Sequence, residues 1–186
     1  MDAYPFLGVP RPLVPGARMT VRTDAEHLRP GSRLVAGFVD AHDAPPRVGT
    51  VALVWGVDRV DDGPDLVSLR GELLVGLGAV DDGRVPVATV EFDRPVPARV
   101  VERLQDAVRA YHGATAEAGE GGDVTVRLAP DPVVASHQVA LLLRISAPEL
   151  QDILEAGDAR ARLERAALVL TRETGLLRTT MGGRGA

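Results

Sequence analysis

The sequence contains no lysine, no asparagine and no cysteine, and two of these absences exclude whole classes of chemistry. All 21 basic residues are arginines, so no lysine can serve a phosphate-binding loop, a Schiff base or a serine–lysine catalytic pair. Without cysteine the chain has no thiol nucleophile, no disulfide and no thiolate metal ligand. The four histidines are not spaced like a metal motif. We therefore expect neither a metal site nor a cofactor.

Aromatic residues are scarce, at 3% of the 186 residues, and the charge balance is acidic. The 26 acidic residues outnumber the 21 basic ones, which gives a formal net charge of -5. An acidic chain with no basic block is a poor candidate for binding a phosphate backbone, so we expect no nucleic-acid partner. No segment has the length of a membrane span, and the N-terminus lacks the pattern of a signal peptide. We expect a cytoplasmic protein without membrane association.

Short valine-rich segments separated by turn residues predict β-strands through the first half of the chain. The expected strands cover residues 18–21, 32–39, 47–60, 66–76 and 85–92. Alternate residues from Val51 to Val57, including Trp55, share one strand face, and the residues between them are also apolar. This pattern predicts burial on both faces. In the following strand, Leu73 is expected on the same side as Val67, Leu69 and Val75. Several such strands favour a small barrel or sandwich.

The hydrophobic period changes to that of a helix after residue 97. Residues 98–111 place apolar side chains on one helical face. Residues 113–122 hold four glycines and three alanines, which predicts a flexible loop. A brief alternation at residues 123–128 predicts one more short strand.

The last third of the chain carries clear helix caps. Asp131 precedes a proline and is a predicted N-cap for a helix that runs to about residue 144. Ser146 and Glu149 have the spacing of a capping box, in which each side chain bonds the other residue's backbone amide. Asp158 is the predicted cap of the final helix, and Gly175 is its predicted end.

Segments in both halves of the chain follow the order found in one known family. The chain opens with an apolar-Pro-apolar strand at residues 4–9 and an apolar-Pro-Gly turn within residues 13–21. A central hairpin follows at residues 48–71, and the closing helices contain the segments 141–146, 150–155 and 161–166. This collinear set, from about residue 4 to 177, resembles the N-terminal, substrate-binding domain of Lon proteases.

The resemblance implies an α+β fold and a binding function. It implies an N-terminal PUA-like β-barrel over residues 1–97, a C-terminal helical bundle over residues 98–178 and a flexible tail over residues 179–186. Domains of this family bind polypeptide. The ATPase and peptidase modules of the full protease are absent from the sequence, and so are the lysines on which both depend. We therefore expect a stand-alone binding module that neither hydrolyses ATP nor cleaves peptides.

The sequence also departs from the family pattern at the central hairpin. The family usually carries an arginine shortly after the glycine of this hairpin, but Gly71 is followed by Glu72 and two leucines. The segment between the first strands is also short. The binding surface of the family therefore cannot be carried over residue by residue.

Four residues are candidates for contact with a ligand: Trp55, Arg70, Glu72 and Tyr111. Trp55 lies between apolar neighbours and is expected first in the core, with a binding anchor as the alternative. Arg70 and Glu72 are two residues apart on one strand face, which favours an exposed ion pair over a pair that flanks a pocket. Tyr111 precedes His112 at a predicted helix end, where proton transfer is less expected than a stabilising role for the histidine.

Three functions stay open on the sequence alone. The first is recognition of polypeptide or apolar segments without proteolysis. The second is a cofactor-independent enzyme of the cyclase or isomerase type, which would shape a small hydrophobic ligand by orientation alone. The third is RNA binding, against which the net acidity and the lack of basic residues clustered with aromatics argue. The serines lie in no nucleophile-elbow context, so a hydrolase is not expected.

Overall fold

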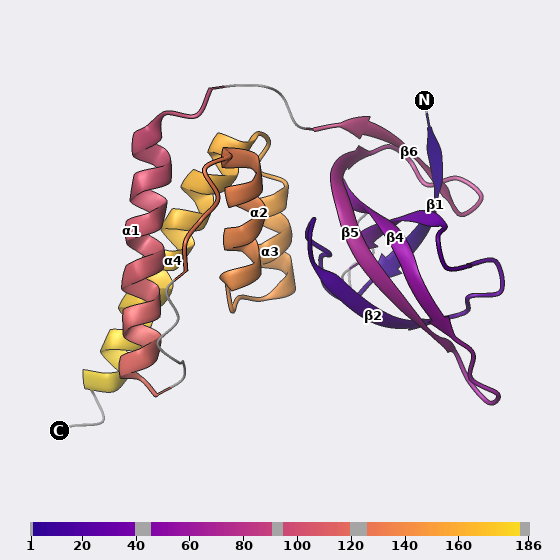
Figure 1. Cartoon of the computed structure of the whole chain (residues 1–186), viewed down its shortest axis with the longest axis horizontal. Helices are drawn as coiled ribbons and strands as arrows, with labels where there is room; N and C mark the ends of the chain where they lie inside the picture. The colour runs from indigo at the N-terminus through magenta and orange to yellow at the C-terminus, as the bar shows by residue number, and fades with distance from the viewer. Residues whose placement is uncertain (1, 40–45, 91–94, 120–125, 183–186) are drawn as a thin grey trace. The chain divides into compact units, whose positions relative to one another are not determined.

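A computed structural model of the chain shows strands in the N-terminal part and helices in the C-terminal part (Figure 1). The structure describes residues 2–39, 46–90, 95–119 and 126–182. The order of the elements confirms the predicted α+β class. The chain forms two compact units, which contain residues 1–92 with 145–155 and residues 93–144 with 156–186.

The first unit contains a six-stranded sheet that closes on itself. The strands are β1 (Ala3–Val9), β2 (Arg18–Thr23), β3 (Arg33–Phe38), β4 (Val48–Asp58), β5 (Asp65–Leu77) and β6 (Arg84–Thr89). Their order is β2-β5-β4-β3-β1-β6, and β6 pairs with β5 as well as with β1. Closure is possible because β5 is 13 residues long and pairs with β2 at residues 65–70 and with β6 at residues 75–77. The expected barrel is therefore present.

The first half of β4 is buried on both faces, as its sequence predicts. Ala52 and Val54 have no exposed surface and belong to a core cluster that includes Leu34 and Leu69. Val51 points the other way, into a second cluster with Val35, Val75 and Val85. Two apolar clusters on opposite faces of one strand hold β4 at the centre of the unit.

Two β-bulges between β4 and β5 change the faces on which side chains lie. The extra residue is Trp55 on β4 and Glu72 on β5. Because strand side chains alternate with a period of two, each extra residue reverses the alternation beyond it. Leu73, which the sequence places on one side with Val75, is 48% exposed, whereas Val75 and Leu74 are both buried.

Gly71 lets β5 contact the turn that precedes β2. Its amide donates a hydrogen bond to the carbonyl oxygen of Ala17 at 2.9 Å, and its carbonyl oxygen accepts one from the amide of Gly16 at 2.9 Å. A Cβ atom at position 71 would lie 2.5 Å from the carbonyl oxygen of Val14. Any other residue would push this turn away from the strand.

One helix, α3 (Ala147–Leu154), belongs to the unit that contains the strands. The side-chain amide of Gln151 donates to the carbonyl oxygen of Val48 at 3.1 Å. The carboxylate of Glu155 accepts from the backbone amide of Arg47 at 2.9 Å and from Gln151 at 2.9 Å. These bonds tie α3 to the start of β4, although the sequence places it among the helices of the C-terminal part.

The second unit contains three described helices, two of which are longer than predicted. They are α1 (Ala98–Glu117), α2 (Pro132–Leu142) and α4 (Ala159–Gly182). α1 passes through Gly113, where a loop was expected, because Ala114 and Thr115 are buried in the next turn. α4 passes through Gly175, its expected end, and enters the predicted tail. A glycine inside a helix costs about 1 kcal/mol, and packing of neighbours such as the buried Thr174 outweighs that cost.

Residues 126–129 bond to glutamine side chains and form no strand. The side-chain amide of Gln105 donates to the carbonyl oxygen of Val126 at 2.9 Å, and its oxygen accepts from the amide of Leu128 at 3.2 Å. Gln138 accepts from the amide of Ala129 at 2.7 Å. The predicted strand is wrong for residues 126–128. The other predicted positions 91–92, 120–122, 123–125 and 183–186 lie outside the described residues.

All three predicted helix caps are confirmed. Asp131 accepts hydrogen bonds from two amides of the first turn of α2, at 2.8 and 3.0 Å. The Ser146 hydroxyl accepts from the amide of Glu149 at 3.4 Å, and the Glu149 carboxylate accepts from the amide of Ser146 at 3.3 Å. Asp158 accepts from an amide in the first turn of α4 at 3.0 Å. These side chains satisfy donors that the helix itself leaves unbonded.

Arg162 is fully buried in the second unit, at 0% exposure. Its Nη1 group donates to the carbonyl oxygen of Gly157 at 2.6 Å, and its Nε group donates to the hydroxyl of Ser136 at 3.2 Å. That hydroxyl in turn donates to the carbonyl oxygen of Val133 at 2.7 Å. The guanidinium therefore connects the start of α4 to α2 through hydrogen bonds in the interior.

Asp65 closes the turn between β4 and β5. Its carboxylate accepts from the amide of Val60 at 3.2 Å and from the guanidinium of Arg59. Burial alone would raise the pKa of Asp65, but the Val60 amide, the Arg59 side chain and the amide of Ala25 outweigh that effect. The pKa of Asp65 therefore lies below its usual value of 3.8.

Removing the cap of α3 should destabilise the fold measurably. We expect Ser146→Ala to lower the free energy of unfolding by about 1 kcal/mol, the usual cost of losing an N-cap acceptor. Ser146→Asp keeps an acceptor and should hold the urea midpoint close to that of the parent chain. Equal midpoints for all three proteins would contradict this role of Ser146.

The contribution of Asp65 to stability should be lost in acid. Because its folded pKa is depressed, the contribution is fully present above pH 3.8, the usual value, and disappears as the pH falls through the folded pKa. Asp65→Asn should therefore lower the urea midpoint at neutral pH and flatten its dependence on pH below 3.8. Asp62→Asn, an exposed change in the same turn, should leave both unchanged. A parallel pH profile for Asp65→Asn and the parent chain would refute this.

Replacing the buried arginine should cost more than replacing an exposed one on the same helix. Arg162→Leu leaves the Gly157 carbonyl and the Ser136 hydroxyl without their donor, so we expect a loss of about 1–3 kcal/mol in the free energy of unfolding. Arg165→Leu is the matched control, because Arg165 is exposed, and should change stability by at most about 0.5 kcal/mol. Urea unfolding of the two variants compares them directly, and similar losses would show that Arg162 has no special role.

Candidate functional site

A row of side chains crosses four strands on the outward face of the sheet. Arg18 on β2 lies opposite Arg70 on β5, Arg70 lies opposite Leu53 on β4, and Leu53 lies opposite Arg33 on β3. Directly opposed residues in antiparallel strands have Cβ atoms about 4.5–5.5 Å apart. Leu69 precedes Arg70 on β5 and is buried in the core. Because neighbouring strand residues point to opposite faces, Arg70 and its row face outward. Three guanidinium groups and a leucine thus form one continuous line.

Trp55 lies on the same face and, at 56%, is the most exposed large apolar residue among those described in the first unit. The expectation that Trp55 belongs to the core is therefore wrong. Its position as the extra residue of a bulge explains the difference, because the strand turns its side chain away from the core at this point. The guanidinium of Arg18 lies over the indole at 5.4 Å, a cation–π arrangement.

The predicted ion pair between Arg70 and Glu72 does not form. Glu72 instead accepts a hydrogen bond from the Nε group of Arg33 at 2.7 Å. The bulge at Glu72 breaks the simple alternation that would have set the carboxylate beside Arg70. The hydrogen bond from Arg33 to Glu72, and then the charge of Glu72, raise the pKa of Arg33. Glu72 therefore neutralises one arginine of the row.

Two arginines of the row face each other directly. Like charges on directly opposed strand residues destabilise a sheet. The contact of Arg18 with the Trp55 ring offsets part of this loss of stability. The side chain of Arg70 forms no hydrogen bond or ion pair with any described residue, so its guanidinium donors are available to a ligand.

The next two rows of this face add two hydroxyl groups and one charge of each sign. In the next row the hydroxyl groups of Thr20 and Ser68 lie 3.3 Å apart. In the following row Arg22 and Asp58 lie on either side of Leu66. The face thus combines four arginines with two carboxylates and an exposed indole, in a chain whose net charge is -5. The expectation that basic residues do not cluster with an aromatic residue is wrong.

Tyr111 lies in the second unit, on α1. Its side chain is 5% exposed, and its ring meets the edge of the His112 ring at a centroid distance of 6.0 Å. The sheet face therefore brings together three of the four predicted residues, and Tyr111 lies elsewhere.

Sequence reasoning missed Arg18, Leu53 and Arg33 as members of this face. Each of these residues fits the alternating pattern of its own strand, so no single strand indicates that the three share a surface. They come together only through the pairing of β2 with β5, β5 with β4 and β4 with β3. That pairing was not readable from the sequence.

Two further properties concern the described residues as a whole. No group of three or more His, Cys, Asp or Glu side chains within them is placed to hold a metal ion. None of the helices they form combines the length and the apolar character needed to cross a membrane.

Comparison with known proteins identifies the fold. No protein-family model matches the chain, and no curated protein matches it. The structure is similar to the N-terminal domain of Mycobacterium avium complex Lon protease, with a TM-score of 0.67 and 19% identity over 91% of this chain and 98% of that one. It is also similar to a Lon N-terminal domain protein from Xanthomonas campestris, with a TM-score of 0.60 and 18% identity over 89% of this chain and 96% of the other.

These similarities confirm the resemblance drawn from the sequence at the level of the fold. The chain has the fold of Lon N-terminal domains over about nine-tenths of its length.

Proposed function

We propose that this chain is a non-proteolytic binding module that holds polypeptide segments on the outward face of its sheet. One observation carries the proposal. The exposed indole of Trp55 lies beside Arg18, in a row that includes Arg70, which has no ionic partner among the described residues. Tryptophan and arginine are the residues most enriched in binding hot spots. The likeness to Lon N-terminal domains supports the same class of function.

The chemistry of the face defines the segments it would bind. Apolar and aromatic side chains of a bound segment would cover Trp55 and the half-buried Leu53. A carboxylate of the segment would accept the hydrogen bonds that Arg70 offers. We therefore expect a preference for unfolded segments in which apolar and acidic residues alternate. Ordering such a segment offsets much of the gain, so the affinity should be modest.

A second candidate function is binding of single-stranded RNA. It is favoured by the same cluster, because bases stack on exposed aromatic rings and arginines contact phosphates. Two features count against it. Glu72 and Asp58 put negative charge on the face, and the whole chain is acidic. Polypeptide binding is therefore the better supported of the two.

The cyclase or isomerase alternative draws no support from this face. Catalysis by orientation needs a substrate held on several sides. The sheet face is open, with its central indole 56% exposed. Adhesion of an extended segment suits such a surface better than enclosure of a small substrate.

The test is a titration of the full chain with fluorescein-labelled casein, an unfolded acidic protein, followed by anisotropy. We expect saturable binding that Trp55→Ala weakens about tenfold, the effect of removing a hot-spot side chain. Arg70→Thr should weaken binding while raising the free energy of unfolding by about 0.2–1 kcal/mol, because it removes a like-charge pair from the sheet. Arg178→Gln, an exposed change on α4, should alter neither property.

The contrary outcomes are distinct. A labelled single-stranded RNA should be titrated in parallel at two salt concentrations. Salt-sensitive RNA binding without casein binding would favour the RNA candidate. Casein binding that is unchanged in both Trp55→Ala and Arg70→Thr would show that the site lies elsewhere on the chain.

A further inference from the structure

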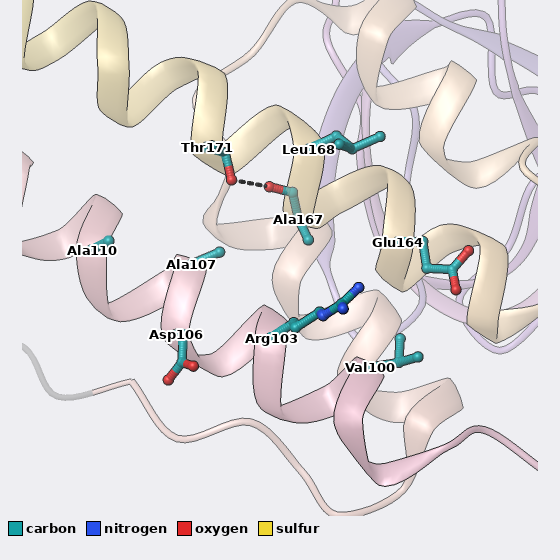
Figure 2. Close-up of a pocket in the computed structure, with 9 residues that line it drawn as sticks. All are labelled: Val100, Arg103, Asp106, Ala107, Ala110, Glu164, Ala167, Leu168 and Thr171. Carbon is teal, nitrogen blue, oxygen red and sulfur yellow. Dashed lines mark hydrogen bonds between the residues drawn. The ribbon is translucent and has the colours of Figure 1, made fainter.

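A groove of about 740 Å³ runs between α1 and α4 of the second unit (Figure 2). The described residues that line it all come from these two helices, which pack against each other. Three alanines, Ala107, Ala110 and Ala167, leave the space open where larger side chains would fill it. Val100 and Leu168 add apolar surface, and Leu168 is 66% exposed. The volume lies in the range usual for small-molecule sites.

The polar groups of the groove are mostly engaged within their own helices. Asp106 forms an ion pair with Arg109 one turn along α1. Glu164 forms one with Arg160 on α4, at 2.9 Å. The hydroxyl of Thr171 donates to the carbonyl oxygen of Ala167 at 2.8 Å, as Figure 2 shows. Each of these groups therefore already has a partner at the rim.

Arg103 differs from the other polar residues of the lining. Its guanidinium group forms no hydrogen bond or ion pair with any described residue. Figure 2 shows its side chain extending from α1 toward α4, between Ala167 and Val100. The two carboxylates of the lining are neutralised by neighbouring arginines, so the groove offers one uncommitted positive charge among apolar walls.

We propose that this groove binds an unbranched apolar carboxylate, with the acid on Arg103 and the hydrocarbon chain along the alanines. A guanidinium matches a carboxylate through two parallel hydrogen bonds. The lining residues of α1 extend from Val100 to Ala110, which at 1.5 Å per residue is about 15 Å of groove. A slender hydrocarbon chain suits walls of small side chains, and it would cover the exposed Leu168. This site lies in a different unit from the proposed polypeptide face and does not depend on it.

Three soluble probes separate the two parts of this recognition. Dodecanoate carries both the chain and the acid, dodecanol carries the chain alone, and acetate carries the acid alone. Each is titrated calorimetrically into the full chain, with dodecanoate kept below its micelle threshold and dodecanol below its solubility limit. We expect one molecule of dodecanoate to bind per chain, dodecanol to bind about tenfold more weakly or worse, and acetate to show no saturable binding.

Two variants and a control locate the site. Arg103→Gln should weaken dodecanoate about tenfold or more and leave dodecanol unchanged, because it removes only the charged anchor. Ala167→Leu narrows the groove and should weaken both. Arg178→Gln makes the same charge change outside the lining and should weaken neither. The urea midpoint of each variant establishes that it is folded.

Several outcomes would overturn the proposal. These are the lack of saturable dodecanoate binding to the parent chain, equal affinity for dodecanoate and dodecanol, and dodecanoate binding that survives Arg103→Gln intact. Trp55→Ala and Arg70→Thr should leave dodecanoate binding unchanged. The two proposals can therefore fail separately: a negative casein titration does not bear on dodecanoate binding, and a negative dodecanoate titration does not bear on casein binding.

Discussion

The register between β4 and β5 is the constraint on which the first unit depends. β5 holds β4 along one edge, and it holds β2 and β6 in succession along the other, so its position fixes the closure of the sheet. Two extra residues, Trp55 and Glu72, reset the alternation and keep apolar side chains in the clusters on both faces of β4. The same two residues turn outward and frame the arginine row. The pairing of β4 with β5 therefore determines both which side chains enter the core and which form the exposed face with the arginine row.

Three arginines show how surroundings decide what one residue type does. Arg162 is buried and donates to fixed acceptors, which makes it part of the framework of the second unit. Arg70 is exposed and lies opposite Arg18, so the two like charges lower the stability of the sheet. The side chain of Arg70 forms no hydrogen bond or ion pair with a described residue that would offset this loss. Arg103 lies among alanines in a groove whose acids are already paired. Departures from local rules, as at Arg70, are expected where binding outweighs stability.

Sequence reasoning succeeded where structure depends on neighbours along the chain. The caps at Asp131 and Ser146 were readable because each acts on amides within three residues. It failed where the result depends on a partner strand, since Trp55 and Leu73 are turned outward by bulges that exist only relative to the opposite strand. Helix ends failed for a related reason. Gly175 has a local cost that packing elsewhere in the unit outweighs. Three of the four candidate residues, Trp55, Arg70 and Glu72, therefore lie on one sheet face, but the face itself was not predicted.

The first unit is made of two separate stretches of chain, residues 1–92 and 145–155, and this sets an order of events during synthesis. After residue 92 the ribosome must add 63 more residues to reach 155, which takes roughly 3–13 s at 5–20 residues per second. Until residues 151 and 155 have been added, the carbonyl of Val48 lacks its Gln151 donor and the amide of Arg47 lacks its Glu155 acceptor. During the synthesis of α1 and α2, these groups at the start of β4 can therefore bond only to water. The last partner of the sheet to arrive is a helix.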